Sequence, residues 1–220
     1  MAYREWALPT ASAVLWHVPA APESRRTRVL PDGCIDLLFT CGELVVAGPD
    51  RTAHVVDDDA GYLGLRFAPG TAPALLGVPA QELCDQRVPL SSLWPRVRAE
   101  RLTDEVITDP AGALARLAGQ AAPDSLAVHV AGLLDAGWSI AATADAVGLS
   151  ARQLHRRSLP AFGYGPKTLA RVLRLQRAVR LVQHGRPPAE VAARTGYVDQ
   201  PHLSREVRAL TGAGLSALRP

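Results

Sequence analysis

The pattern of hydrophobic and polar residues changes twice along the 220-residue chain. From residue 12 to residue 67, short β-prone runs alternate with turn-forming residues. The run at 61–67 is the clearest, because Leu63, Leu65 and Phe67 fall on one face of a strand and Arg66 on the other. After Gly70 the signals are helical but interrupted by prolines, and residues 122–220 have helical periodicity throughout. The pattern predicts an α+β protein, with a small β-barrel and flanking helices followed by an all-α domain.

The apolar periodicity of residues 122–220 predicts a series of helices with recognisable ends. The expected helices are Ser125–Ala136, Ile140–Val147, Ser150–Leu159, Pro166–His184, Pro188–Arg194 and Asp199–Leu210. Ser150 and Gln153 have the spacing of a capping box at a helix start. Pro160 is expected to end its helix early, whereas Pro201 lies in a first turn, where proline is tolerated.

A short pattern occurs twice within these helices. The sequences ADAVG at 144–148 and AARTG at 192–196 each place a small residue four positions before a glycine. Each copy continues through a polar turn to an apolar anchor, Leu154 or Leu203, and then to a second glycine. The small residue allows two helices to cross closely, and glycine suits the turn between them. The repeat therefore predicts two helix-turn-helix units on one chain.

The helix between the two units has the properties of a spacer. Two recognition helices that enter successive major grooves lie about 34 Å apart, and a helix of about 19 residues spans roughly 28 Å. The spacer is basic, with Lys167, Arg171, Arg174, Arg177 and Arg180 along it. These side chains are either phosphate contacts or ordinary solvated arginines, and the sequence alone leaves both interpretations open.

Charge is distributed unevenly between the two parts of the chain. Residues 122–220 contain 13 Arg and Lys against 6 Asp and Glu, whereas residues 1–121 contain 11 against 15. A basic half beside an acidic half indicates a nucleic-acid-binding module joined to a domain of another kind. The irregular spacing of Cys34, Cys41 and Cys84 argues against a secreted disulfide scaffold. With no apolar leader and no long apolar run, we expect a cytoplasmic protein.

Residues 122–220 resemble the DNA-binding domain of the AraC/XylS family of transcription regulators. The resemblance is carried by AATADAVGLSARQLHRR, LARVLRLQRAVRLV and AEVAARTGYVDQPHLSREVRALTG. It implies that the first recognition helix presents Arg152, His155 and Arg156 to DNA, and the second Gln200, His202, Ser204 and Arg205. Arginine pairs with guanine and glutamine with adenine, while serine and histidine read bases or hold phosphate. The chain departs from the family at Ser158 and Val207, where an aromatic residue is common.

The N-terminal half resembles, less specifically, the cupin-like sensor domains that precede some AraC-type domains. The sequences LPDGCIDLLF, VAGPDRTAHVV and GLRFAPGTAPALLGVPAQEL carry this resemblance. It implies a domain at 1–121 that senses an effector or dimerises, before a DNA-binding domain at 122–220. The partners it implies are double-stranded promoter DNA, with RNA polymerase, a small-molecule effector and a second copy of the chain also allowed. His17 and His54 are too far apart for the metal site of a cupin enzyme, so we expect no metal or other cofactor and no catalysis.

Three other interpretations remain open at this point. Arg66 is either a contact for an acidic ligand or an ion-paired arginine. Cys34, Cys41 and Cys84 would serve a thiol- or metal-dependent repair or sensor protein that acts on DNA, provided that their thiols are reactive. The N-terminal half could instead only dimerise, which would make a regulator without an effector.

Overall fold

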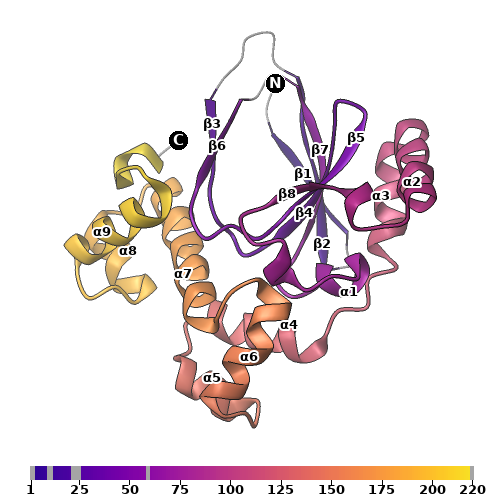
Figure 1. Ribbon diagram of the computed structural model, residues 1–220. Coiled ribbons are helices and arrows are strands. Elements are labelled where there is room, and N and C mark those ends of the chain that lie inside the picture. The colour runs from indigo at the N-terminus through magenta and orange to yellow at the C-terminus, as the bar shows by residue number, and fades with distance from the viewer. Residues whose placement is uncertain (1–2, 9–11, 21–25, 58–59, 219–220) are drawn as a thin grey trace.

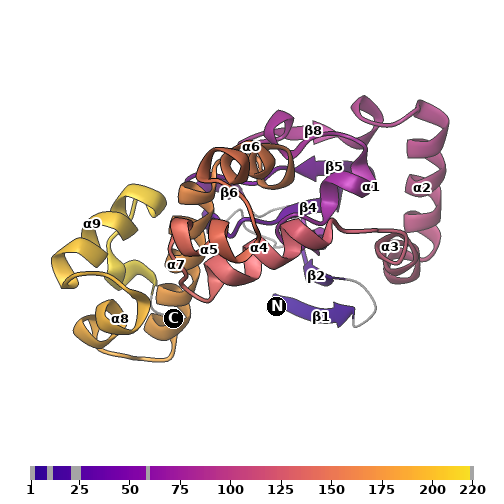
Figure 2. The same cartoon turned by 90° about the horizontal axis from the view of Figure 1, so that it is seen from below.

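The computed structural model describes residues 3–8, 12–20, 26–57 and 60–218. A sheet region comes first in the chain and a helical region follows it (Figure 1). Viewed from below, the helices α4 to α9 lie to one side of the sheet, while α2 and α3 lie on its opposite side (Figure 2). The mixed α+β class predicted from the sequence is confirmed.

The main sheet is antiparallel and has six strands in the order β1-β2-β7-β4-β5-β8. Its strands are β1 (Arg4–Leu8), β2 (Ala13–Val18), β7 (Tyr62–Phe67), β4 (Ile35–Thr40), β5 (Glu43–Ala47) and β8 (Arg87–Pro89). Leu37, Leu65 and Leu15 are opposite one another on adjacent strands and point into the core, each at most 5% exposed. Arg66 pairs with Asp36 on the other face, as the alternation in the sequence predicted.

A closed barrel was expected, but the described strands pair differently. Strands β3 (Arg26–Val29) and β6 (His54–Asp57) form a separate two-stranded ribbon. The edge strands β1 and β8 do not pair with each other among the described residues. The four residues Arg4–Ala7 of β1 are exposed, and β8 is three residues long and ends in a proline. Short, polar or proline-bearing strands suit sheet edges, so the described sheet is open.

Helices and short 3₁₀ turns complete the sheet region. They are α1 (Ala72–Leu76), η1 (Ala80–Glu82), η2 (Leu90–Ser92), α2 (Arg96–Thr108) and α3 (Pro110–Ala118). Leu102 and Val106 of α2, together with Leu114 and Leu117 of α3, pack in the same apolar cluster as the sheet residues. This first core is built from residues of the sheet region alone.

The helical region contains two further cores, one for each repeat. Its elements are α4 (Ser125–Asp135), α5 (Ile140–Ala146), α6 (Ala151–Phe162), α7 (Pro166–Gln183), α8 (Pro188–Thr195), α9 (Gln200–Thr211) and η3 (Leu215–Leu218). The N-terminal half of α7 belongs to the core of α4, α5 and α6, and its C-terminal half to the core of α8 and α9. At 18 residues, α7 is about 27 Å long. No helix in the described part of the chain is both long and apolar enough to cross a membrane.

Pro160 does not end α6, which is a correction to the sequence-based expectation. The helix continues to Phe162 and is capped by Gly163 in a left-handed conformation, whose N–H donates to the Leu159 carbonyl. Proline removes one backbone hydrogen bond, but Phe162 is 2% exposed and anchors the last turn in the second core. Burial of this aromatic side chain holds the turn that the proline weakens.

Candidate nucleic-acid interface

The first unit, α5 and α6, is a helix-turn-helix built as the sequence predicted. Ala144 is 4% exposed where the helices cross, and Gly148 has φ +66° in the turn. The side chain of Ser150 accepts from the N–H of Gln153, whose own side chain accepts from the N–H of Ser150, so the predicted capping box is present. Leu154 is 1% exposed and fixes which face of α6 points outward.

The second unit, α8 and α9, repeats this construction. Ala192 is 2% exposed, and Gly196 has φ +79° at the end of α8. Asp199 caps α9 by accepting the N–H of His202 at 2.6 Å. Leu203 is fully buried and takes the place that Leu154 has in the first unit. Each unit therefore presents one amphipathic helix whose anchor leucine is buried.

The residues expected to contact DNA lie on the outer faces of these two helices, with some differences between them. Arg152, Arg156, Gln200 and Arg205 are exposed, and Ser204 is partly exposed. His155 is exposed too, but its ring lies against Gly165, because a Cβ built there would be 2.6 Å from His155 Cε1.

His202 is engaged within the second unit. Its Nδ1 accepts the N–H of Val198 at 3.4 Å, and its ring packs edge-on against Tyr197 with centroids 5.3 Å apart. Its Nε2 is 3.9 Å from a carboxylate oxygen of Glu206. Val198 itself is 87% exposed, although it is apolar. Val198 was not predicted as a site residue, because what marks it is the high exposure of an apolar side chain, and exposure is seen only in the structure.

The arginines of the recognition helices differ from those of α7 in their partners. In the described part of the chain, Arg152 and Arg156 of α6 make no ion pair, and neither do Arg205 and Arg208 of α9. Arg208 was not among the predicted residues, although it follows Arg205 by three positions on the same helix. A free guanidinium on an exposed helix face is available to phosphate or to the edge of a guanine.

Two arginines of α7 are instead held by one carboxylate. Glu206 Oε1 is 2.7 Å from Arg174 Nη2, and Glu206 Oε2 is 3.5 Å from Arg171 Nε. Arg174 also lies over the ring of Tyr197, with 4.4 Å between its Cζ and the ring centroid. Burial raises the pKa of Tyr197 to about 12, and the charge of Glu206 adds to the shift. The sequence left open whether the linker arginines contact phosphate, and Arg174 is engaged within the protein by Glu206 and Tyr197.

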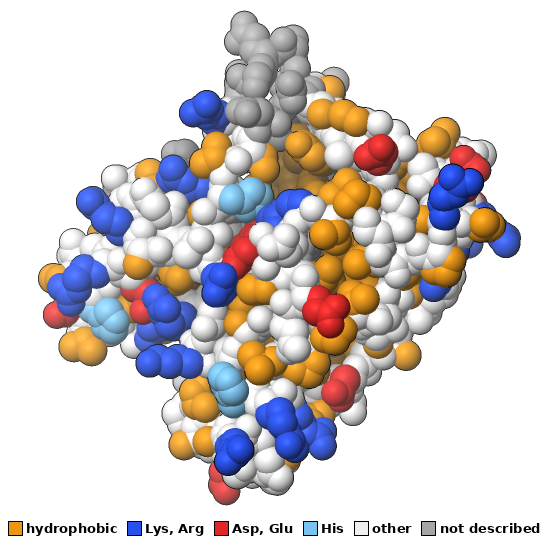
Figure 3. Space-filling model, in the orientation of Figure 1, with side chains coloured by type: hydrophobic (Ala, Val, Ile, Leu, Met, Phe, Trp, Pro, Cys, Tyr) orange, Lys and Arg blue, Asp and Glu red, His pale blue; other side chains and the backbone are white. Residues whose placement is uncertain are grey.

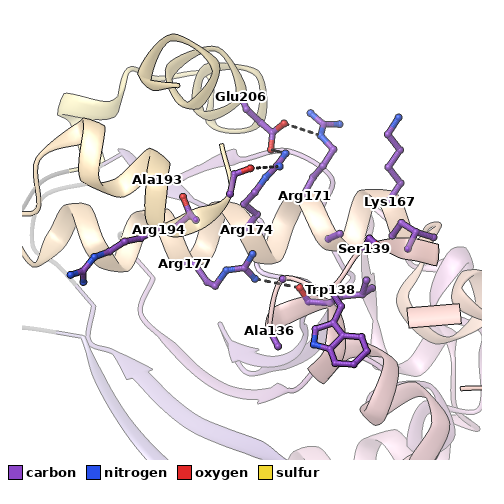
Figure 4. Close-up of a pocket in the computed structure, with 16 residues that line it drawn as sticks. Ala136, Trp138, Ser139, Lys167, Arg171, Arg174, Arg177, Ala193, Arg194 and Glu206 are labelled. Atoms are coloured by element: carbon purple, nitrogen blue, oxygen red, sulfur yellow. Dashed lines mark hydrogen bonds and ion pairs between the residues drawn. The ribbon is translucent and has the colours of Figure 1, made fainter. Parts of the chain in front are cut away.

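Arg177 fastens the linker helix to the end of α4. It donates to the carbonyl oxygens of Asp135 and Leu134 and forms a 3.3 Å ion pair with the Asp135 side chain. These carbonyls belong to the C-terminal turn of α4, where the helix dipole favours a cation. Lys167, at the other end of α7, is exposed, and its side chain points away from that helix in the close-up (Figure 4).

An open cleft of about 870 Å³ separates the two units. Its floor is α7. One wall comes from the end of α4 and the start of α5, and the other from the last turn of α8 and from Glu206 of α9 (Figure 4). Its charged lining residues are Lys167, Arg171, Arg174, Arg177, Arg194 and Glu206. Lys and Arg side chains also gather over the lower part of the helical region (Figure 3). The cleft and its surroundings thus have a positive charge that suits a polyanion.

The alternative sites of the sheet region are engaged internally. Arg66 Nε is 3.2 Å from Asp36 and 3.3 Å from Asp32, so its charge is already matched by carboxylates. Burial raises the pKa of the Cys34 thiol, and that of Cys84 to about 11. The three cysteines are free thiols, and no cluster of three potential metal ligands occurs among the described residues. Raised thiol pKa values disfavour thiolate chemistry at Cys34 and Cys84.

Two helix-turn-helix units joined by a basic helix define a class of DNA-binding proteins. Residues 143–220 match the family described as "Helix-turn-helix domain". This match covers most of the helical region and agrees with the AraC/XylS resemblance seen in the sequence. Residues 11–89 match a family described as "Domain of unknown function (DUF6597)". No curated protein matches the chain.

Solved structures resemble the chain at low sequence identity. Apo ToxT K231A from Vibrio cholerae is 10% identical, covers 94% of this chain and 96% of its own, and has a TM-score of 0.50. The C-terminal domain of AraT, a response regulator from Geobacillus stearothermophilus, is 18% identical over 43% of this chain and 84% of its own, with a TM-score of 0.41. A probable AraC family transcriptional regulator from Rhodopseudomonas palustris is 24% identical over 44% of this chain and 100% of its own, at 0.38. The ToxT comparison shows a similar fold along most of the chain.

Proposed function

We propose that the chain is a sequence-specific transcriptional regulator that binds promoter DNA with both helix-turn-helix units. The observation that carries the proposal is the set of unpaired arginines on the outer faces of α6 and α9, in two units with the same construction. In this proposal residues 122–220 are the DNA-binding domain and residues 1–121 a sensor or dimerisation domain. Promoter DNA as the partner implies action in the cytoplasm.

The proposed base readers are outward residues in the first half of each recognition helix. Arg152 and Arg156 would read guanine from α6, and Arg205 would do so from α9, each with two hydrogen bonds to one base. Gln200, exposed in the first turn of α9, would pair with adenine. Ser204 and His155 would hold phosphate or the edge of a base.

Val198 and His202 are proposed to act together. The ring nitrogen of His202 holds the N–H of Val198, and this contact keeps the exposed valine at the start of the recognition helix. An exposed apolar side chain in a major groove fits the methyl group of thymine. In this proposal the main role of His202 is to position Val198. Its partly exposed ring is also available to phosphate.

Most of the affinity is proposed to come from phosphate contacts and to fall steeply with salt. Lys167 and the partly exposed Arg171 at the cleft are the linker residues best placed for this task. Effector control, dimerisation through the sheet region and contact with RNA polymerase stay predictions from the family resemblance. Melting the full-length protein with and without candidate small molecules tests effector control, because a ligand that binds only the folded state raises Tm.

The proposal is tested with Arg156→Ala and Arg205→Ala, with Arg157→Ala as the matched control. Arg157 is also exposed on α6, but it lines a pocket against α4 and not the outer face. Binding is measured to a DNA sequence selected from a random library and to unrelated DNA. Arg156→Ala and Arg205→Ala are each expected to cost about 1–3 kcal/mol on the selected sequence and much less on unrelated DNA. Equal losses for all three variants on both DNAs would contradict base reading.

A further inference from the structure

One loop of the sheet region touches the C-terminal ends of both recognition helices. This positioning loop, residues 48–53, joins β5 to β6. Pro49 lies against the end of α6, because a Cβ built on the capping Gly163 would come within 2.7 Å of Pro49 Cγ. Four residues later, the N–H of Ala53 donates a 2.7 Å hydrogen bond to the carbonyl of Leu210, in the last turn of α9. The two units thus share one support outside α7.

The positioning loop is itself fastened to the edge of the main sheet. Asp50 pairs with Arg87 of β8 at 2.5 Å, and Arg51 pairs with Asp85 at 2.5 Å. The carbonyl of Pro49 accepts the N–H of Asp85 at 3.3 Å. Ion pairs on both sides of one peptide segment, together with backbone bonds, leave the loop little freedom to move independently of the sheet.

Other contacts place the sheet region against the same two units. The short turn η1 packs on α6, and its Ala80 carbonyl would be 3.1 Å from a Cβ on Gly163. The side chain of Gln176, midway along α7, donates to the Pro31 carbonyl at 2.7 Å. Leu30 packs into the core of the second unit. In Figure 1 the ribbon of β3 and β6 lies between the main sheet and this second unit, next to α7.

The linker helix alone leaves the distance between the units poorly fixed. Helices curve with radii of about 60–100 Å, so the ends of a helix about 27 Å long can differ in direction by roughly 15–25°. At about 10 Å from the helix axis, a typical packing distance, 25° displaces a recognition helix by about 4 Å. Successive base pairs are about 3.4 Å apart. The open cleft between the units offers no packing that would oppose this motion.

We propose that the positioning loop sets the distance between the two recognition helices, and so makes the protein select one spacing between two blocks of bases. This role rests on the proposed function. Its residues touch no DNA and act by positioning α6 and α9. A sheet region that only sensed or dimerised would not need to contact the ends of both recognition helices.

Two substitutions weaken the loop contacts, and a third is the matched control. Gly163→Ala places a methyl group against Pro49 and pushes the loop away from α6. Ala53→Pro removes the N–H that donates to the Leu210 carbonyl. Gly212→Ala is the control, because Gly163 and Gly212 both cap a recognition helix, with φ +84° and +67°. Alanine therefore imposes a similar backbone strain at both positions, but nothing lies within 4 Å of a Cβ at Gly212.

The experiment measures the Kd of full-length protein for duplexes that carry the two selected blocks at spacings changed one base pair at a time. A duplex with a single block is measured in parallel. Wild type is expected to prefer one spacing by about tenfold over its neighbours, the cost of one disrupted contact. Gly163→Ala and Ala53→Pro are expected to lower this ratio to about threefold or less, with single-block affinity unchanged. Gly212→Ala is expected to keep the wild-type ratio.

Three results would overturn the inference while leaving the proposed function in place. In the first, both loop variants keep the wild-type ratio of Kd between neighbouring and preferred spacings. In the second, Gly212→Ala lowers this ratio as much as the loop variants do. In the third, the wild type binds two blocks equally well at every spacing. Gly163→Ala keeps the test decisive if Ala53→Pro fails to fold. A wild type that selects no sequence at all would instead refute the proposed function, and with it this inference.

Discussion

Replacement of Glu206 by glutamine is expected to change stability and DNA affinity in opposite directions. The Glu206 side chain is 10% exposed and is paired with Arg174 at 2.7 Å. Glutamine at this position keeps a hydrogen bond to the charged guanidinium but removes the charge of the acceptor. We expect this to cost roughly 1 kcal/mol of the about 1.5–3 kcal/mol that a charge-assisted hydrogen bond contributes. The pair with Arg171 adds little, because that arginine is 38% exposed. The expected fall in Tm is about 2–4 °C for a chain of this size.

DNA binding is expected to strengthen in the same variant. Two arginines at the cleft lose their carboxylate, and each new phosphate contact steepens the dependence of log K on log salt by about 0.9. Affinity for unrelated DNA is measured between 50 and 200 mM salt, and Tm by calorimetry. Glu105→Gln is the control, since it removes the same charge from an exposed pair on α2, far along the chain from the helical units. A fall in Tm with an unchanged salt slope would refute the idea that the cleft faces DNA.

Further outcomes follow from the cores and from titrating groups. Leu154→Ala and Leu203→Ala, both at fully buried anchors, are each expected to cost about 2–5 kcal/mol in urea unfolding; a cost below about 1 kcal/mol would contradict the buried placement. Alkylation at pH 8, followed by mass spectrometry, is expected to modify the exposed Cys41 before Cys34 and Cys84, because burial raises the pKa of the latter two thiols. Rapid modification of Cys34 would restore the thiol-sensor alternative. Burial raises the pKa of Asp36 from 3.8 to about 6, so the folded state binds this proton more tightly than the unfolded state does. The stability it contributes is complete below about pH 3.8 and is lost as the pH rises through about 6. Wild type should therefore lose stability relative to Asp36→Asn over that interval, and parallel pH profiles would contradict the shift.

The helical region could be predicted closely because its signals are local. Caps such as Ser150 with Gln153, the turn glycines and the buried anchors Leu154 and Leu203 all act within one or two turns of a helix. The expected helices agree with the observed ones to within a few residues. The expectation that Pro160 ends its helix was wrong. The burial of Phe162, which compensates for the lost hydrogen bond, depends on tertiary packing, and a rule based on local sequence does not include it.

The sheet region could be predicted only in part, since pairing between strands is non-local. Of the central strands, β7 was visible from its apolar alternation, whereas β2, β4 and β5 lie in the short β-prone runs between turn-forming residues. The strands β1, β3 and β8 were missed, because a largely exposed or three-residue strand lacks an apolar face. The separation of β3 and β6 from the main sheet is also absent from the local pattern, and so a closed barrel was expected.

The candidate site required the structure for a different reason. Sequence spacing indicated which arginines are on the recognition helices, but not which of them already have a partner. Glu206 is 32 residues from Arg174 in the chain, and only folding brings them together. The contacts of the 48–53 loop with Gly163 and Leu210 join still more distant positions and leave no periodic signal in the sequence.

DNA recognition by both helix-turn-helix units is tested by selection of bound DNA from a random library, with the full-length protein at low salt. Base reading by both units predicts an enriched motif of two short blocks whose centres are about one helical turn, roughly 10 base pairs, apart. Selection by Arg156→Ala should weaken one block, and selection by Arg205→Ala the other. A single enriched block would contradict base reading by both units. Equal recovery of all sequences would contradict sequence-specific DNA binding altogether.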